Sequence, residues 1–371
     1  MKSKKKKLIM GMALSGALLL AGCSTSGESK KEETAKKSKD DTHIVKDIAG
    51  HEVEVPKSIN GMAITPLPWS AIVYAIDGSA DHILGAREGT KQAYDISILP
   101  KMEPNMGKID TSYIDNNGGI NMEEIANVKP DVALLWDSQT AEREQLEKLG
   151  IAPVMINSDT IDNLKAGFTT VGQLLGKEKR ADEVNKNYDE AHEYLLSKKD
   201  KVKEAKKVKV LFVRGETLQL QSFSEYVNDT VIELSGGENV AHDLVGKGNV
   251  ELNMEQIYKW NPDVIFLTNF DESKPSDLYE NKIEGQDWSK ISAVQKKQVY
   301  KTPKGIYRWD VAGVETPLMV RFMASKIQPE IFSDANFEKE VETFYQDFFD
   351  YKLTTADMNF MTNCEVNKES K

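Results

Sequence analysis

The side chains in this sequence that are best suited to binding are arginines and aromatics that follow short apolar runs. Each run has the length and composition of a β-strand buried on both faces. In a parallel sheet, ligands bind outside the carboxyl ends of the strands, so residues that follow a strand are candidates for ligand contact. The candidates are Trp69, Arg87, Trp136, Arg214, Phe270, Tyr307, Arg308 and Trp309.

These residue types together predict a site for a bulky anionic or partly apolar ligand. Aromatic rings offer apolar faces, and arginine offers a fixed fork of donors for anionic oxygens. Each residue also has a purely structural alternative, because a tryptophan in a loop often fills the core and an arginine in a loop often pairs with a nearby acid. Both alternatives stay open at this point.

Catalysis has little support in the sequence. The five histidines are His43, His51, His82, His192 and His242. None has the spacing of a zinc motif such as HExxH, and none lies near a Ser or Cys in a nucleophile motif. There is also no glycine-rich phosphate loop after a strand. We therefore expect no enzyme and no histidine-built metal site, while a site built from oxygen ligands stays open.

The elements that must position the candidates include one stretch that occurs twice. Residues 120–136 read INMEEIANVKPDVALLW, and residues 252–268 read LNMEQIYKWNPDVIFLT. In each copy an Asn caps a helix, an acid follows in the first turn (Glu123 or Glu255), and Pro-Asp ends the helix before an apolar run. Two matching helix–turn–strand units predict two similar α/β lobes.

The remaining patterns set the boundaries of these lobes. We expect a first lobe over residues 42–177, with a hairpin at 43–56 and an irregular region at 88–115, and a second lobe over residues 206–371. Between them, residues 178–205 are charged, lack Gly and Pro, and place apolar residues on one helical face. A helix of about 28 residues would be about 42 Å long and would act as a rigid strut. The expected fold is α/β, with two mostly parallel sheets joined by this helix.

The amino terminus has the pattern of an export signal. Lysines at the start precede an apolar run at 8–20, and Leu20-Ala21-Gly22-Cys23 resembles the cleavage box of bacterial lipoproteins. This predicts a signal peptide at 1–22, lipidation of Cys23, and a disordered tether at 23–41. Cleavage would remove five Lys and no acid, so the formal charge would change from −11 to −16. Such an acidic protein is a poor candidate for nucleic-acid binding.

Several of these features together resemble the substrate-binding lipoproteins of ABC importers for ferric siderophores, haem and cobalamin. They are the lipoprotein box, the hairpin IVKDIAGHEVEVP, the repeated unit, the single strut helix and LSGGENV. The resemblance runs over about residues 42–357, nearly the whole mature chain. The resemblance implies two Rossmann-like lobes joined by one long helix, with little domain motion on binding. It also implies a monomer anchored by lipid to the extracytoplasmic face of the cell membrane, which delivers its ligand to an ABC permease dimer with a cytoplasmic ATPase.

The resemblance assigns a role to the repeated acids, because in cobalamin-binding relatives one Glu per lobe pairs with arginines of the permease. Glu123 and Glu255 stand at those positions. A stabilising role at helix N-termini, worth about 0.3–1 kcal/mol each, is compatible with docking.

The resemblance leaves the ligand open. A ferric siderophore suits the arginines and aromatics. The iron of haem would instead require an axial ligand such as Met102, Met106 or Tyr113. Cobalamin, nickel chelates and molybdate are further alternatives in the same class. No intrinsic cofactor is expected. An exported two-lobed enzyme is the rival from another class.

Overall fold

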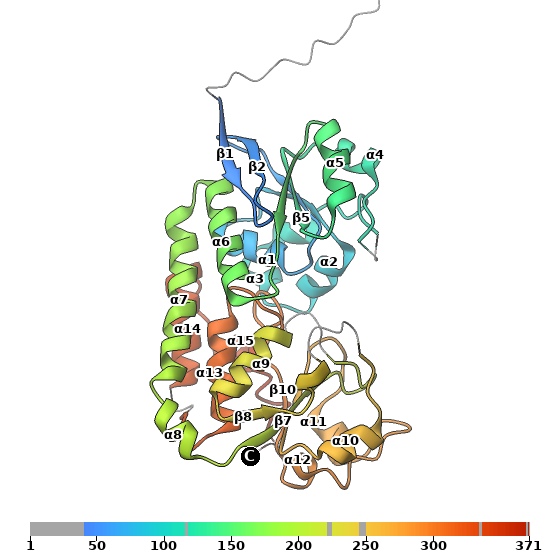
Figure 1. The fold of residues 1–371 in the computed structure, drawn as a ribbon, viewed down its shortest axis with the longest axis vertical. Coiled ribbons are helices and arrows are strands. Elements are labelled where there is room, and N and C mark those ends of the chain that lie inside the picture. Colours follow the sequence, from blue (N-terminus) through green and yellow to red (C-terminus); the bar gives the residue numbers. More distant parts are fainter. Residues whose placement is uncertain are drawn as a thin grey trace, which may run out of the picture. The chain divides into compact units, whose positions relative to one another are not determined.

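The computed structural model describes residues 41–115, 118–220, 225–244, 250–333, 336–368 and 370. Residues Lys39–Lys371 form one compact unit, and this unit contains two four-stranded parallel sheets (Figure 1). The expected signal peptide and Cys23 lie outside the described residues. Within the described ranges, no helix is both long enough and apolar enough to cross a membrane.

Lobe one is built on the sheet β4-β3-β5-β6. Its strands are β3 (Met62–Ile64), β4 (Ile83–Ala86), β5 (Val132–Trp136) and β6 (Ala152–Ile156). Its helices are α1 (Trp69–Asp77), α2 (Glu88–Asp95), α3 (Leu99–Met102), the 3-10 helix η2 (Pro104–Lys108), α4 (Met122–Val128), α5 (Thr140–Lys148) and α6 (Ile161–Leu175). The predicted hairpin is present as antiparallel β1 (Thr42–Lys46) and β2 (Glu52–Pro56).

Lobe two is built on the sheet β10-β9-β7-β8. Its strands are β7 (Val208–Val213), β8 (Gly237–Asn239), β9 (Val264–Leu267) and β10 (Val299–Lys301). Its helices are α9 (Glu225–Leu234), the 3-10 helix η3 (His242–Leu244), α10 (Met254–Trp260), α11 (Pro275–Tyr279), α12 (Ser292–Gln295), α13 (Thr316–Ile327), α14 (Phe337–Phe349) and α15 (Thr355–Met361).

The two sheets have the same topology. Counted along the chain within each lobe, both have the strand order 2-1-3-4. The repeated stretch supplies the third strand of each sheet, β5 or β9, and this strand pairs with the first strand of its own lobe. The prediction of two α/β lobes with parallel sheets is therefore confirmed.

Two polar residues that both repeat copies share, the capping Asn and the Asp after Pro, position the third strand beside the first. Asn121 accepts hydrogen bonds from the amides of Glu123 and Glu124, and Asn253 accepts one from the amide of Gln256, so both Asn side chains cap their helices. The following Asp in each copy then joins the first strand of the sheet. The amide of Asp131 donates to the carbonyl of Gly61 at 3.0 Å, and that of Asp263 donates to Lys209 at 2.8 Å.

The strands are buried on both faces because apolar side chains alternate between two clusters. In β5, Val132 and Leu134 join a large shared core, while Ala133 and Leu135 join a cluster on the opposite face. The strands β7 and β9 of lobe two alternate in the same way. The shared core includes residues of both sheets and of the connecting helix, so it is continuous from one lobe to the other. Continuous apolar runs, as the sequence shows, are the pattern expected for such strands.

The connecting helix is shorter than predicted. The structure has α7 (Glu178–Leu196) and, after a break at Ser197 and Lys198, the short helix α8 (Lys199–Glu204). The hydroxyl of Ser197 donates to the carbonyl of Tyr194 at 2.7 Å, a local bond that competes with continuation of the helix. The buried residues of α7 are Ala181, Val184, Tyr188, Ala191 and Leu195, all of the predicted face except Tyr194, which is only partly buried.

Several direct contacts connect the lobes beside α7. Arg180 of α7 donates from Nε to the carbonyl of Ala75 in α1 at 3.0 Å and from a terminal nitrogen to the carbonyl of Phe348 in α14. The amide of Ile98 donates to the carbonyl of Gly305 at 3.0 Å. Lys101 of α3 forms an ion pair with Asp357 of α15. Together these bonds connect lobe one and α7 to elements that follow β10.

Three further parts of the fold differ from the sequence-based expectation. The region 88–115, expected to be irregular, contains α2, α3 and η2. Gly236-Gly237 follows α9 in a position typical of a helix stop, yet Gly237 begins β8, which pairs with β7. The chain also continues beyond the last amphipathic stretch, Phe337–Phe349, into α15, and α15 and the turn that follows it pack on lobe two. There the side chain of Asn367 bonds both the amide and the carbonyl of Lys301 in β10, at 2.8 and 2.9 Å.

The contact between α1 and α6 generates a stability prediction. Gly167 of α6 lies against Trp69, and a Cβ at this position would be 2.2 Å from the Trp69 ring. Gly167→Ala would gain about 1 kcal/mol of helix propensity. Overpacking a well-packed core costs about 1–3 kcal/mol, and the fully buried ring has no free space to move into. Because the ring cannot move away, the cost should lie in the upper part of this range, about 2–3 kcal/mol, and we expect a net loss of about 1–2 kcal/mol in the free energy of unfolding.

This loss is measured by guanidinium unfolding, as a lower midpoint at unchanged slope. Ala166→Ser, at the exposed neighbouring position, is the matched control and should stay within about 0.5 kcal/mol of the parent. An unchanged midpoint for Gly167→Ala would contradict the packing described here.

Candidate functional site

The carboxyl ends of the strands in both lobes meet at one cavity. Its lining from lobe one is Leu67, Pro68, Arg87 and Trp136, and its lining from lobe two is Phe270, Tyr307 and Val311. The enclosed space is narrow, about 20 Å³. Four of the candidates from the sequence, Arg87, Trp136, Phe270 and Tyr307, are therefore brought together here. Trp136 is the last residue of β5, and the other three lie on segments that follow a strand.

Two more candidates, Arg214 and Arg308, lie against the ring of Phe270. The guanidinium carbon of Arg214 is 4.6 Å from the centroid of Phe270, and that of Arg308 is 4.5 Å from it. Arg308 is held in addition by a bond from its Nε to the carbonyl of Asn269 at 2.9 Å. Stacking on an aromatic face leaves the outward N–H groups of a guanidinium able to reach an anion.

Buried acids and a buried lysine lie close to these arginines. Asp310 is fully buried and accepts hydrogen bonds from the amide of Asn269 at 2.7 Å and from the hydroxyl of Thr302 at 3.2 Å. Lys301 donates to the carbonyls of Thr268 and Asp271 at 2.6 and 2.8 Å. This network fixes the end of β9 to the segment that follows β10.

Burial sets the direction of the pKa shifts in this network. It raises the pKa of Asp310 and lowers the pKa values of Lys301 and Arg214, because the charged form of each group loses hydration. For Arg214, the nearby carboxylates of Asp271 and Asp310 oppose this shift. The arginine keeps its charge at neutral pH, since its ordinary pKa is far above 7.

A second buried carboxylate supports the loop that carries Tyr307 and Arg308. Glu315 accepts hydrogen bonds from the amides of Ile306 and Tyr307, both at 3.2 Å, and from the hydroxyl of Tyr345. Burial raises the pKa of Glu315 to about 7, although these hydrogen bonds act in the opposite direction. Glu315 stands directly before α13, and no motif in the sequence marks it as a buried acid.

Two of the candidates are not in a position to touch a ligand. Trp69 has an exposed fraction of 0% and packs against Phe168, and Trp309 has 2% and packs edge-on against Phe337. For both, the structural alternative describes the observed position, because each indole fills the core directly behind a strand end. The expectation that these rings form the surface of the site is corrected accordingly.

The residues considered as haem ligands are also mostly in the core. Met106 is 1% exposed, and Tyr113 is fully buried and donates to the carbonyl of Ile64 at 3.0 Å. Of the three, only Met102 is partly buried rather than fully buried. Among the described residues, no group of three or more His, Cys, Asp and Glu side chains could hold a metal ion. Three histidines instead contact a single Asp each: His51 with Asp47, His82 with Asp77 and His242 with Asp229.

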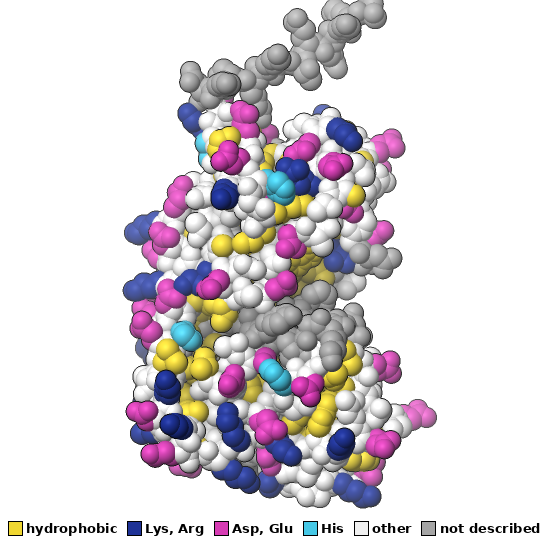
Figure 2. Space-filling view, viewed as in Figure 1, with side chains coloured by type: hydrophobic (Ala, Val, Ile, Leu, Met, Phe, Trp, Pro, Cys, Tyr) yellow, Lys and Arg dark blue, Asp and Glu magenta, His cyan; other side chains and the backbone are white. Residues whose placement is uncertain are grey.

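The two acids of the repeated stretch occupy equivalent places in the two lobes. Glu123 lies in the first turn of α4 and Glu255 in the first turn of α10, and both side chains are exposed. On the face of the molecule shown in Figure 2, acidic and basic side chains are scattered rather than gathered into a patch of one sign.

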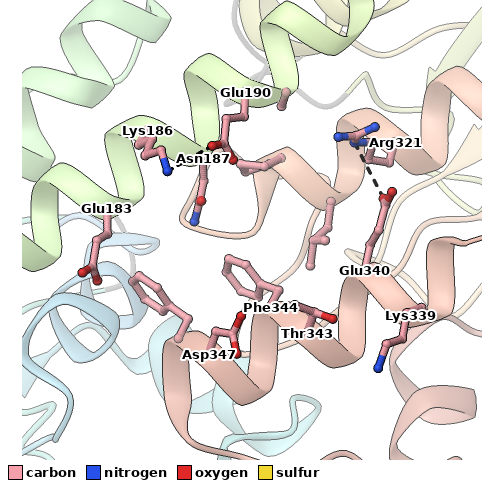
Figure 3. Close-up of a pocket in the computed structure, with 14 residues that line it drawn as sticks. Glu183, Lys186, Asn187, Glu190, Arg321, Lys339, Glu340, Thr343, Phe344 and Asp347 are labelled. Atoms are coloured by element: carbon pink, nitrogen blue, oxygen red, sulfur yellow. Dashed lines mark ion pairs between the residues drawn. The ribbon is translucent and has the colours of Figure 1, made fainter.

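A larger groove lies elsewhere, between α7, α13 and α14 (Figure 3). Lys186 pairs with Glu190 at 3.2 Å along α7, and Arg321 of α13 approaches Glu340 of α14 at 3.7 Å. The guanidinium of Arg321 also lies 3.5 Å from the ring centroid of Tyr194. Four charged side chains of this groove are thus engaged with one another in two pairs, and the groove is distinct from the strand ends where the sequence placed the site.

Comparison with known proteins gives a consistent result. Residues 75–305 match the family model described as "Periplasmic binding protein". The molybdate-binding protein MolA of Haemophilus influenzae is 22% identical over 82% of this chain and 90% of its own length. Its solved structure, which overlays with a TM-score of 0.68, is described as the cognate periplasmic binding protein of an ABC transporter.

Two more similar proteins are also named as binding proteins. The iron(3+)-hydroxamate-binding protein FhuD of Bacillus subtilis is 24% identical over 83% of this chain and 95% of its own length. A periplasmic solute binding protein of Veillonella parvula is 38% identical, covers 88% of this chain and 98% of its own, and overlays with a TM-score of 0.82.

These matches confirm the resemblance to the substrate-binding proteins of ABC importers and exclude the rival reading as an enzyme. The family model covers more than half of the chain, and the Veillonella protein is well over 30% identical across most of it. The chain therefore belongs to the periplasmic binding protein family, whose members are extracytoplasmic receptors for small ligands.

Proposed function

We propose that this chain is a lipid-anchored receptor that binds an anionic metal chelate between its two lobes and delivers it to an ABC permease. A ferric siderophore is the first candidate ligand, as expected from the sequence. The observation that carries the proposal is the placement of Arg87, Arg214 and Arg308 around Phe270 and Tyr307, where the strand ends of both lobes meet.

The charge of this region supports an anionic ligand. Three guanidiniums contribute three positive charges, while the carboxylates of Asp271 and Asp310 lie near enough to Arg214 to act on it electrostatically. Asp310 is fully buried and bonded to Asn269 and Thr302, so it supports the arginines from within the protein. Partly buried arginines bind carboxylate, hydroxamate or oxyanion oxygens more strongly than exposed ones, because less water competes.

The narrow cavity favours a second candidate, a small metal oxyanion such as molybdate. A space of about 20 Å³ holds about one water-sized group. A siderophore would have to lie at the mouth of this space or displace the side chains that line it. The relative MolA, named as a molybdate-binding protein, supports this candidate, and FhuD supports the hydroxamate chelate. Haem is less well supported, because Met106 and Tyr113 are in the core.

The membrane anchor is proposed from the sequence alone. Leu20-Ala21-Gly22-Cys23 supports lipidation of Cys23, and the polar stretch up to Asp41 would connect the lipid to β1. Two or more acyl chains hold a protein stably on a membrane at about 0.8 kcal/mol per buried CH₂. The receptor would act as a monomer at the outer face of the cell membrane.

Docking to the permease is proposed to use Glu123 and Glu255. Their exposure, their equivalent positions in two lobes of the same topology, and their place at the start of α4 and α10 support this role. Two like charges related by an approximate symmetry suit a permease dimer that presents matching arginines.

The ligand class is tested by titrating the purified protein with a ferric hydroxamate, a ferric catecholate, sodium molybdate, haem and cobalamin. Because Trp136 lines the cavity, we expect the matching ligand to quench its fluorescence. Isothermal titration calorimetry would give the affinity independently. If none of these probes bound, the proposed class of ligand would be wrong.

The anion site is tested with Arg308→Lys. Lysine keeps the charge but loses both the stacking on Phe270 and the bond from Nε to Asn269. Losing about 1–2 kcal/mol of these interactions should weaken ligand affinity about tenfold or more. Arg321→Lys is the matched control, since Arg321 is also stacked on an aromatic ring but lies outside the cavity. Equal affinities of the two variants would argue against the site.

Docking is tested with the double variant Glu123→Ala and Glu255→Ala. We expect ligand affinity to stay at the parent value while ligand uptake by cells falls at least tenfold, because buried charge pairs in an interface each contribute several kcal/mol. A control pair, Glu142→Ala with Glu280→Ala, removes one acid from each lobe at other positions. Normal uptake with the Glu123 and Glu255 variant would exclude the docking role.

A further inference from the structure

The loop that brings Tyr307 and Arg308 to the cavity is held from behind by one carboxylate. Residues 302–309 connect β10 to the segment before α13, and Glu315 at the start of α13 is 3% exposed. Its two oxygens accept from the consecutive amides of Ile306 and Tyr307 at 3.2 Å each. These two bonds fix the backbone immediately before Arg308.

The neighbouring glycine shows how closely the loop approaches this carboxylate. A Cβ on Gly305 would lie 1.7 Å from an oxygen of Glu315 and 2.2 Å from the hydroxyl oxygen of Tyr345. The carbonyl of the same glycine accepts from the amide of Ile98 in lobe one at 3.0 Å. The short stretch 305–308 therefore touches the carboxylate, the cavity and the other lobe.

The groups that face Glu315 determine what its ionisation changes. Tyr345 of α14 donates its hydroxyl to Glu315, and Tyr74 of α1 acts electrostatically on Tyr345. Tyr307 and Trp309 lie on the loop itself. An ionised carboxylate accepts with both oxygens, whereas a protonated one must use one oxygen as a donor. The bonds to the two amides are therefore stronger in the ionised form.

We propose that Glu315 is a positioning residue for ligand binding, whose buried carboxylate holds the 305–308 backbone so that Tyr307 and Arg308 face the cavity. The part that concerns binding rests on the function proposed above, while the part that concerns the loop can be measured without any ligand. Glu315 itself does not touch the cavity, since its partners are backbone amides and Tyr345.

The experiment measures hydrogen exchange at the amides of Ile306 and Tyr307 in the full-length protein and in Glu315→Gln. Because burial raises the pKa of Glu315 to about 7, raising the pH from 6 to 8 ionises the group. The protection factors of these amides should then increase several-fold in the parent. In Glu315→Gln they should be about tenfold lower than in the parent at pH 8, with no such rise. Glu340→Gln, an acid-to-amide change on α14, is the control and should behave as the parent.

Affinity is measured on the same proteins with sodium molybdate and a ferric hydroxamate. Glu315→Gln should bind the probe that the parent binds about tenfold more weakly, which corresponds to about 1.4 kcal/mol. Tyr345→Phe keeps the carboxylate and removes one donor, so the pH midpoint of amide protection should move upward. This variant keeps the test valid if Glu315→Gln does not fold.

The outcomes separate the two proposals. Unchanged amide protection in Glu315→Gln, or lower protection with unchanged affinity, would overturn the positioning role. If the parent bound neither probe, these two ligand candidates would fail, and the amide measurement would still decide whether Glu315 holds the loop.

Discussion

The whole candidate site depends on one geometric constraint: strands of a parallel sheet end at the same edge. In each lobe the first strand pairs with the third, so β3 and β5, like β7 and β9, deliver their last residues side by side. The residues at or after these strand ends, among them Trp136, Arg214 and Phe270, come from distant parts of the sequence. They meet because the two sheets have the same strand order and turn these edges toward each other.

The second lobe contains most of the charged groups that support the site. Asp310, Lys301 and Glu315 are each less than a tenth exposed, and each is bonded to the backbone of a strand end or of the loop after β10. Burying a charge is unfavourable unless it is paired or hydrogen-bonded. Lobe one contributes Arg87 and Trp136 to the cavity from the N-cap of α2 and from the end of β5.

Some elements of the fold could be predicted from the sequence, and others could not. The strands β5 and β9 were predictable because their apolar runs are continuous and an Asn-capped helix precedes each. The strand β8 was missed because Gly237-Glu238-Asn239 has no apolar signal, and only its pairing with β7 makes it a strand. The helices α2 and α3 were missed because Pro100 and Pro104 suggested an irregular region, although prolines are tolerated in the first turn of a helix.

For the site, sequence position could not separate exposed from buried side chains. Trp69 and Trp136 both stand near the end of a strand, yet only Trp136 reaches the cavity, because the chain turns into α1 at Trp69 and directs that ring against Phe168. The acids behind the site were not recognised for a related reason. Glu315 looks like any acid at a helix start, and its burial follows from the packing of α14, whose residue Tyr345 is far away in the sequence.

The continuity of the apolar core through α7 has a consequence for the transport cycle. Because side chains of both sheets and of α7 share one cluster, and Arg180 bonds α1 and α14 at once, spreading the lobes would expose apolar surface and break several bonds together. An empty receptor and a loaded one would then present Glu123 and Glu255 at nearly the same separation. If these two acids dock the transporter as proposed, empty receptors would compete with loaded ones for it.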